Sequence, residues 1–171
     1  MKIRTLYSGM LWAWMAAALL AANPCLAGGA QPNDSDSLRG LKSTKAVFDV
    51  TTGNPKKLSF YLNLIEQTAD SMRSAGVKPD FVVTFRGPAT FFVSSDRERI
   101  KLEDTPVADK IQGQLDELSH KPNVKLEQCS VAAKALHVDT RTIYPSVKVV
   151  GNSWISLIGY QNRGYALVPV R

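Results

Sequence analysis

Hydrophobic and polar positions follow two alternating periods along most of the chain, from about Lys45 onward. Short apolar runs with the length of β-strands occur at residues 46–50, 81–85, 124–128, 147–150 and 165–168. The segments between these runs repeat apolar residues at the spacing of a helix face, most clearly from Leu58 to Met72. Strands separated by helices form parallel sheets with helices on both faces. We therefore expect an α/β fold with a three-layer, doubly wound (Rossmann/flavodoxin-like), mostly parallel five-stranded sheet.

The turn after the first predicted strand, Thr51–Pro55, has the residues of a helix start. Asn54 is a preferred N-cap residue, and Pro55 suits the first helical position. A Thr-Gly-Asn turn also resembles the phosphate loop of flavodoxins, but Pro55 lacks an N–H group and Val50 stands where that loop has a hydroxyl. The sequence contains no Gly-rich nucleotide loop, no CxxC and no HExxH motif. We therefore predict no cofactor and no metal site.

The beginning of the chain has the three-part pattern of a secretory signal peptide. Lys2 and Arg4 precede an uncharged apolar run, Met10–Ala22, and small residues follow it. The run is shorter than the roughly 20 residues that span a membrane. We predict a signal peptide at 1–27, a flexible linker at 28–44 and a folded domain at 45–171. The alternatives are an uncleaved N-terminal anchor and a lipoprotein acylated at Cys25.

Cleavage after Ala27 would leave a periplasmic or secreted protein with no membrane segment and with one cysteine, Cys129. A lone cysteine cannot form an intramolecular disulfide, so it is buried, reactive or paired with another chain. The full chain has a formal net charge of +6, and its basic residues are spread along the sequence without a run. This distribution predicts no nucleic-acid partner.

In a doubly wound fold, ligands bind outside the carboxyl ends of the strands. This rule selects polar residues directly after the predicted strands without reference to any motif. The candidate site residues are Thr52, Asn54, Arg86, Cys129, Asn152 and Ser153.

Cys129 is the most informative candidate, because it follows the third predicted strand and begins a helix. The partial positive charge of a helix N-terminus favours the thiolate and lowers the pKa of a cysteine. The position equally fits a small buried hydrophobic residue at a strand–helix junction. His120 and His137 are both expected at helix ends remote from Cys129, so a Cys–His hydrolase is not favoured. Arg86 is better placed to assist the thiolate.

Several segments resemble the DsrE/DsrF-like sulfur-relay family. They are the cysteine segment Val124–Ala133, the strand Val147–Gly151, the segment Arg163–Leu167, and the Asn54-Pro55 and Gly87-Pro88 turns. The resemblance covers about residues 45–170. It implies an α/β domain, a small homo-oligomer and, in characterised members, a cysteine that carries sulfur as a persulfide between partner proteins. The family's cysteine matches Cys129.

The residues and the resemblance together predict an exported sulfurtransferase or sulfur carrier. Cys129 would accept a sulfane sulfur and pass it to an acceptor thiol, with Arg86 assisting and no cofactor. The expected partners are sulfur donor and acceptor proteins and, in a trimer or hexamer, further copies of the chain. Phe91, Phe92 and Trp154 lie on short segments that a monomer would leave partly uncovered. The alternative function is a non-catalytic module that binds a small ligand or a protein, with an inert Cys129.

Overall fold

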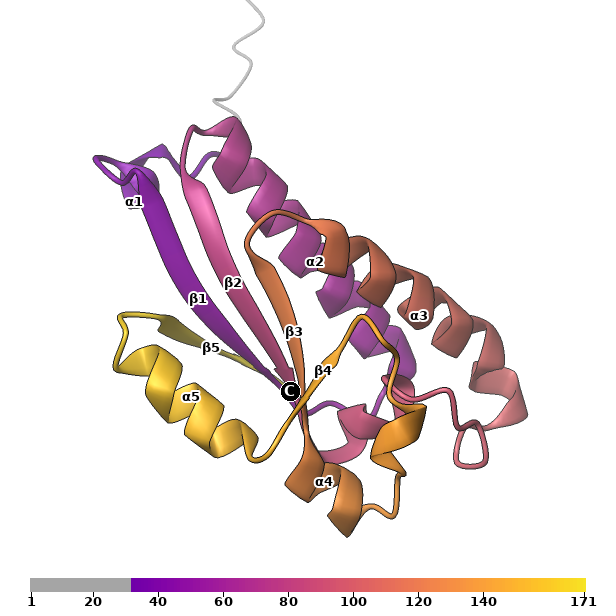
Figure 1. Ribbon diagram of the computed structural model, residues 1–171. Coiled ribbons are helices and arrows are strands. Elements are labelled where there is room, and N and C mark those ends of the chain that lie inside the picture. The colour runs from indigo at the N-terminus through magenta and orange to yellow at the C-terminus, as the bar shows by residue number, and fades with distance from the viewer. Residues whose placement is uncertain (1–31) are drawn as a thin grey trace, which may run out of the picture. The chain divides into compact units, whose positions relative to one another are not determined.

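Parallel pairing of five strands organises residues 32–171, the part of the chain that the computed structural model describes (Figure 1). The strands are β1 (Ser43–Val50), β2 (Lys78–Phe85), β3 (Val124–Cys129), β4 (Lys148–Val150) and β5 (Ala166–Val170). They lie in the order β4-β3-β2-β1-β5, and each neighbouring pair is parallel. The predicted α/β class and parallel five-stranded sheet are therefore confirmed.

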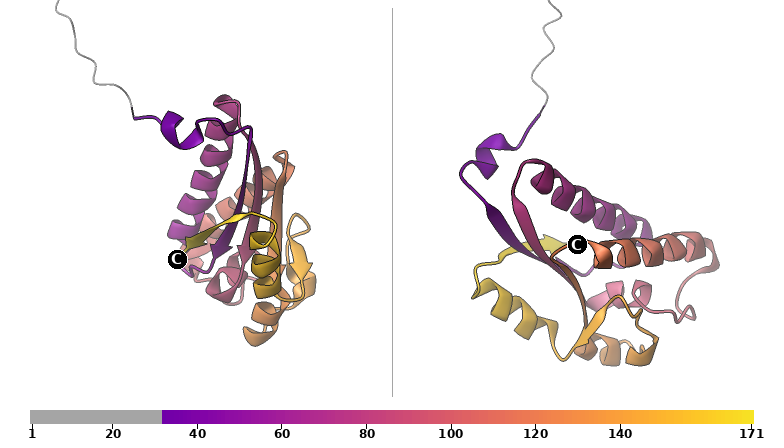
Figure 2. Two further views of the ribbon diagram at one scale, coloured as in Figure 1. Left: turned by 90° about the vertical axis from the view of Figure 1, so that its left-hand side faces the viewer. Right: turned by 45° about the horizontal axis from the view of Figure 1, so that its top comes forward.

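Helices cover both faces of this sheet (Figures 1 and 2). The α-helices are α1 (Ser35–Leu38), α2 (Pro55–Ser74), α3 (Thr105–His120), α4 (Ser130–Ala135) and α5 (Ser153–Gln161). Residues 32–171 also contain three short 3₁₀ helices, η1 (Gly87–Phe92), η2 (Leu102–Asp104) and η3 (Thr140–Thr142). Helices α2 and α3 pack on one face and α5 packs on the other, whereas α4 lies beyond the carboxyl end of β3. The chain crosses the sheet from β1 to β4, and α5 then returns it to the far side of β1.

Alternate residues of the central strands enter two separate apolar layers. Phe48 and Phe81 face α2 and contact each other edge to face, with ring centroids 5.1 Å apart. Val47 and Val82 face α5 and pack with its residue Leu157 in a smaller cluster. Each fully buried side chain of this size stabilises the fold by about 1.5–3 kcal/mol. Burial on both faces explains the nearly continuous apolar run, interrupted only by Thr84, that ends β2.

The predicted start and end of the first long helix are confirmed. Asn54 precedes α2, and its side chain accepts a hydrogen bond from the Lys57 backbone N–H at 3.0 Å. Pro55 occupies the first helical position. Gly76 follows the helix with φ of +79°, a conformation that glycine adopts without steric cost.

The second half of the predicted linker at 28–44 is structured, which corrects that part of the prediction. Ser35–Leu38 form α1, and β1 begins at Ser43, before the predicted domain start at Lys45. Ser43 already pairs with Lys78 of β2, because backbone pairing does not require apolar side chains. The predicted signal peptide at 1–27 and residues 28–31 lie outside the described residues. Within residues 32–171, no helix has the length and apolar character needed to cross a membrane.

Candidate functional site

Cys129 ends β3 and is the N-cap residue of α4. The residue is 4% exposed, and its thiol lines a cavity of about 250 Å³ at the carboxyl edge of the sheet. The preceding residue, Gln128, is fully buried, and its side-chain amide donates to the Thr90 hydroxyl and to the Cys129 carbonyl, both at 2.9 Å. Gln128 thus fixes the backbone of Cys129 against η1.

The N-termini of α4 and α5 meet at the sulfur of Cys129. The Ser153 backbone N–H, at the start of α5, donates to Cys129 Sγ at 3.3 Å. Asn152 caps α5 by accepting a hydrogen bond from the Trp154 N–H at 2.9 Å. Ser130 donates from its hydroxyl to the Gly151 carbonyl at 2.8 Å, which ties the start of α4 to the loop before α5. Two sets of backbone N–H groups therefore face one thiol.

These contacts lower the pKa of the Cys129 thiol below its usual value, although burial acts in the opposite direction. Burial is the largest influence and raises the pKa, because it penalises the charged thiolate. The Ser153 hydroxyl, followed by the backbone N–H groups of Ser153, Ala132 and Val131, outweighs it. Ser153 Oγ is itself buried and has no other hydrogen-bond partner within residues 32–171, and a hydroxyl hydrogen rotates freely to suit an acceptor. It is therefore available to a thiolate.

Arg86 lines the same cavity and is held by a buried aspartate. Its Nε and Nη2 donate to the two carboxylate oxygens of Asp49, each at 2.7 Å. Arg171 also donates to Asp49, at 3.1 Å. The hydrogen bonds that Arg86 donates to Asp49 raise the pKa of Arg86, and a Cys129 thiolate acts in the same direction. Arg86 is thus a permanently charged group that favours the thiolate.

The structure brings together four of the six residues predicted for the site. Arg86, Cys129, Asn152 and Ser153 all line the cavity.

The other two predicted residues serve the β1–α2 turn. Asn54 caps α2, and the Thr52 hydroxyl accepts the Asn54 N–H at 3.3 Å. Within residues 32–171, neither of them and neither of the histidines lines the cavity of Cys129. His120 is exposed at the end of α3, and its Nδ1 lies 2.8 Å from the Asp116 carbonyl oxygen.

Sequence reasoning missed Asp49 and the apolar rim of the cavity. Asp49 is 3% exposed. In the sequence, the feature that could have identified it is a single carboxylate inside the apolar run Ala46–Val50. The rim is formed by Val131 and Trp154, which line the cavity and are 55% and 63% exposed. Trp154 thus fits the expectation of a partly uncovered aromatic, whereas Phe92 is a core residue at 5% exposure.

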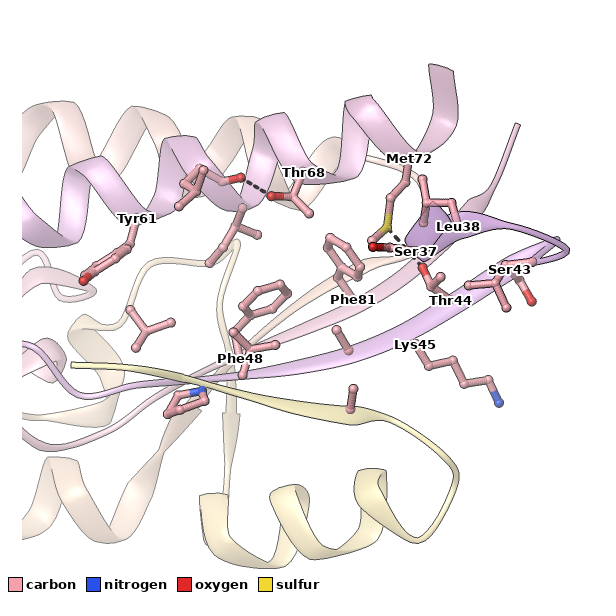
Figure 3. Close-up of a pocket in the computed structure, with 18 residues that line it drawn as sticks. Ser37, Leu38, Ser43, Thr44, Lys45, Phe48, Tyr61, Thr68, Met72 and Phe81 are labelled. Carbon is pink, nitrogen blue, oxygen red and sulfur yellow. Dashed lines mark hydrogen bonds between the residues drawn. The ribbon is translucent and has the colours of Figure 1, made fainter. Parts of the chain in front are cut away.

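A larger cavity, of about 670 Å³, lies between α2 and the β1–β5 side of the sheet (Figure 3). Phe48, Phe81 and Tyr61 point into it, and the Thr44 hydroxyl donates to Met72 Sδ at 3.2 Å near one end. Lys45 borders the cavity, but its side chain points away, and its Nζ donates to the Arg163 carbonyl at 3.4 Å. The lining of this cavity is mostly apolar and, within residues 32–171, includes no cysteine.

Within residues 32–171, no group of three or more His, Cys, Asp or Glu side chains is arranged to hold a metal ion.

The fold and the site define a parallel α/β protein with a cysteine at the carboxyl edge of its sheet. The chain belongs to the DsrE/DsrF-like family, whose model matches residues 45–170. It is 33% identical over 125 residues to an uncharacterized protein of Aquifex aeolicus (strain VF5). That match covers 73% of this chain and 55% of the relative, so the chain spans about half the length of this curated relative.

A solved structure supports the fold. The protein of unknown function MTH1491 from Methanobacterium thermoautotrophicum superposes with a TM-score of 0.58 at 15% sequence identity. The match covers 74% of this chain and 98% of that one. At this identity the similarity establishes the shared fold alone.

Proposed function

We propose that this protein carries sulfur as a persulfide on Cys129. The Cys129 thiolate attacks the outer sulfur of a persulfide or polysulfide donor, a new S–S bond forms at Cys129, and the donor thiolate leaves with the electron pair of the broken bond. An acceptor thiolate then attacks the outer sulfur of the Cys129 persulfide and releases the Cys129 thiolate. A sulfane sulfur moves in both steps without net oxidation or reduction, so no redox cofactor is needed.

The observation that carries this proposal is the environment of the Cys129 sulfur. It lines a cavity, accepts the Ser153 N–H at 3.3 Å and has a lowered pKa. The thiolate is the nucleophile in sulfur exchange, and a thiol with a lowered pKa is also the better leaving group in the second step. Membership of the DsrE/DsrF-like family supports sulfur relay as the class of function.

Intact-mass measurement tests the proposal. Folded protein treated with a polysulfide donor should gain one sulfur atom, and a reductant should remove it. A Cys25→Ser variant, the matched control for the other cysteine of the sequence, should gain the sulfur as well. A Cys129→Ser variant should not. A sulfur adduct that appears only after denaturation would contradict the proposal.

We place this activity outside the cytoplasm, on the basis of the signal-peptide pattern before Gly28. The mature protein should then begin near Gly28 and carry no lipid. N-terminal sequencing of the purified protein that found Met1 or an acylated Cys25 would contradict this location.

The second candidate function is binding of an apolar small molecule, with Cys129 as a structural residue. The cavity of about 670 Å³ between α2 and the β1–β5 side of the sheet favours it. This cavity lies away from the thiol, whereas the sequence predicted a binding pocket at the carboxyl edge. Slow iodoacetamide labelling of the folded protein would favour this second function over sulfur transfer.

A further inference from the structure

The outer face of α5 carries large apolar side chains that the described chain leaves uncovered. Trp154, Ile155 and Ile158 are 63%, 70% and 59% exposed. Their spacing places them on one side of the helix, while Leu157 and Tyr160 pack against the sheet on the other. Monomeric soluble proteins rarely expose such contiguous apolar area outside an interaction site.

This face is continuous with the rim of the Cys129 cavity. Trp154 and the exposed Val131 of α4 line the cavity and also belong to the surface of the protein. We call Val131, Trp154, Ile155 and Ile158 the α5 apolar surface. A protein that covered this surface would therefore contact two of the residues that line the Cys129 cavity.

The charge around the α5 apolar surface is basic. After Glu127 the sequence has a single acidic residue, Asp139, and its carboxylate is paired with Arg141. Exposed cations occur in the same part of the chain. Lys134 follows Val131 by three residues on α4, Lys148 lies on β4, and Arg163 lies over the Tyr160 ring of α5, 4.6 Å from its centroid. Arg86, at the cavity itself, shares the single carboxylate of Asp49 with Arg171, so these three groups together leave one positive charge.

The charge selects the kind of partner. A symmetric contact between two copies of this face would bring the same cations together, which is unfavourable. A partner with an acidic rim around an apolar centre would be attracted to it. We propose that the α5 apolar surface docks an acidic protein that presents a thiol to Cys129. This inference rests on the proposed function, because it names the partner for sulfur exchange at the same residue.

Two synthetic cysteine peptides test the inference. They have the same length and the same apolar residues, but one carries glutamate flanks and the other lysine flanks, and each is supplied as a mixed disulfide with thionitrobenzoate. The Cys129 thiolate attacks the peptide sulfur, a Cys129–peptide disulfide forms, and thionitrobenzoate leaves with the electron pair, which gives a colour change. Each rate is divided by the rate of the same peptide with mercaptoethanol, which removes differences in intrinsic reactivity.

The glutamate peptide should react with the wild-type protein about tenfold faster than the lysine peptide at low salt, and the difference should shrink as salt is added.

Ile155→Gln and Ile158→Gln should each slow the reaction of the glutamate peptide about fivefold, as is usual for a central interface residue. Both residues lie outside the lining of the cavity, so the rate with dipyridyl disulfide, a small neutral reagent, should not change. Leu102→Gln, which alters a residue 89% exposed on η2, is the matched control and should leave every rate unchanged.

The contrary outcomes are distinct. The docking surface would be wrong if the two peptides reacted at equal rates or if the isoleucine variants had no effect. In that case, labelling of Cys129 by dipyridyl disulfide would still support the proposed function. If either isoleucine variant dissociated an oligomer in light scattering, the occupant would be a second copy of the chain, and the proposal would be wrong. If dipyridyl disulfide failed to label folded wild-type protein, the proposed function would fail and the docking surface with it.

Discussion

Cys129 is surrounded by hydrogen-bond donors, so its replacement by serine should preserve the fold. The serine hydroxyl can accept the Ser153 N–H and cap α4, and a serine cap is worth about 0.5–2 kcal/mol over a residue that cannot cap. We expect Cys129→Ser to have at least the wild-type melting temperature and to lose all thiol labelling of the folded domain. If Cys129 were only a buried hydrophobic residue, the unpartnered hydroxyl would cost about 1–3 kcal/mol and lower the melting temperature by several degrees.

Replacement of Ser153 tests which hydrogen bonds lower the pKa of Cys129. Its hydroxyl is the largest influence that lowers this pKa, and its Oγ has no other hydrogen-bond partner within residues 32–171. Ser153→Ala should therefore raise the pKa of Cys129 and slow alkylation at neutral pH, with little change in stability. The measurement is the rate of iodoacetamide labelling against pH, in which the midpoint should move upward. An unchanged midpoint would assign the effect to the backbone N–H groups of the two helices.

Asp49 links the stability of the fold to pH. Burial raises the pKa of Asp49, but the hydrogen bonds from Arg86 and Arg171 lower it by more, so its pKa in the folded state lies below the usual aspartate value of 3.8. A carboxylate with a depressed pKa stabilises the fold above its unfolded-state value, and this contribution is lost as the pH falls through the folded-state value. Stability should therefore fall as the pH drops below about 4.

Asp49→Asn should remove this contribution at neutral pH and flatten the acid dependence. We expect a loss of about 1.5–3 kcal/mol at pH 7, the worth of hydrogen bonds to a charged group. Urea unfolding at neutral and acidic pH measures both effects. Asp109→Asn is the control, because it removes the exposed partner of Arg97 and should change stability little. If the Asp49→Asn variant still lost as much stability at acidic pH as the wild type, the Asp49–Arg86 pair would not be the source of the acid dependence.

At the scale of the elements, the β1–α2 turn distinguishes a helix cap from a binding residue. Asn54→Ala removes the side-chain acceptor for the Lys57 N–H and should cost about 1 kcal/mol in the free energy of unfolding. Asn54→Ser keeps a capping oxygen and should retain most of that stability. Neither change should alter Cys129 labelling, because Asn54 does not line the cavity. If either variant slowed Cys129 labelling without changing stability, Asn54 would have to be counted as a site residue.

The number of strands and their parallel pairing were predicted from the hydrophobic pattern, most clearly for β1, β2 and β3, which carry runs of buried residues. The order of the strands in the sheet was not predicted. The ends of the strands could not be predicted in this way. β1 begins at Ser43 and β2 at Lys78, two exposed polar residues that join the sheet only through their backbone. Arg86 and Cys129 could be predicted from the rule that parallel strands place their carboxyl ends at one edge. Asp49 could not be assigned as the partner of Arg86, because that contact joins β1 to the residue after β2, far apart in the sequence. The large apolar cavity was equally hidden, since it forms between segments distant in the sequence, such as α2 and β5.

At the scale of the whole molecule, a second apolar region is available for assembly. Leu41, Leu64 and Val168 are partly exposed where they line the cavity between α2 and the β1–β5 side, and Phe60 on α2 is 61% exposed. Within residues 32–171, β5 pairs only with β1, so its outer edge offers free backbone groups to another chain. This region is separate from the basic α5 apolar surface.

We expect the protein to assemble through this second region, as a trimer or hexamer according to the resemblance to sulfur-relay proteins. Light scattering at micromolar concentration should give the mass of the oligomer. Leu64→Glu should reduce it to one chain, because a carboxylate on an apolar contact opposes association. Leu102→Glu, which alters an 89% exposed residue on η2, should leave the mass of the oligomer unchanged. A wild-type mass of a single chain would contradict the prediction, and a Leu64→Glu oligomer of full size would place the contact elsewhere on the surface.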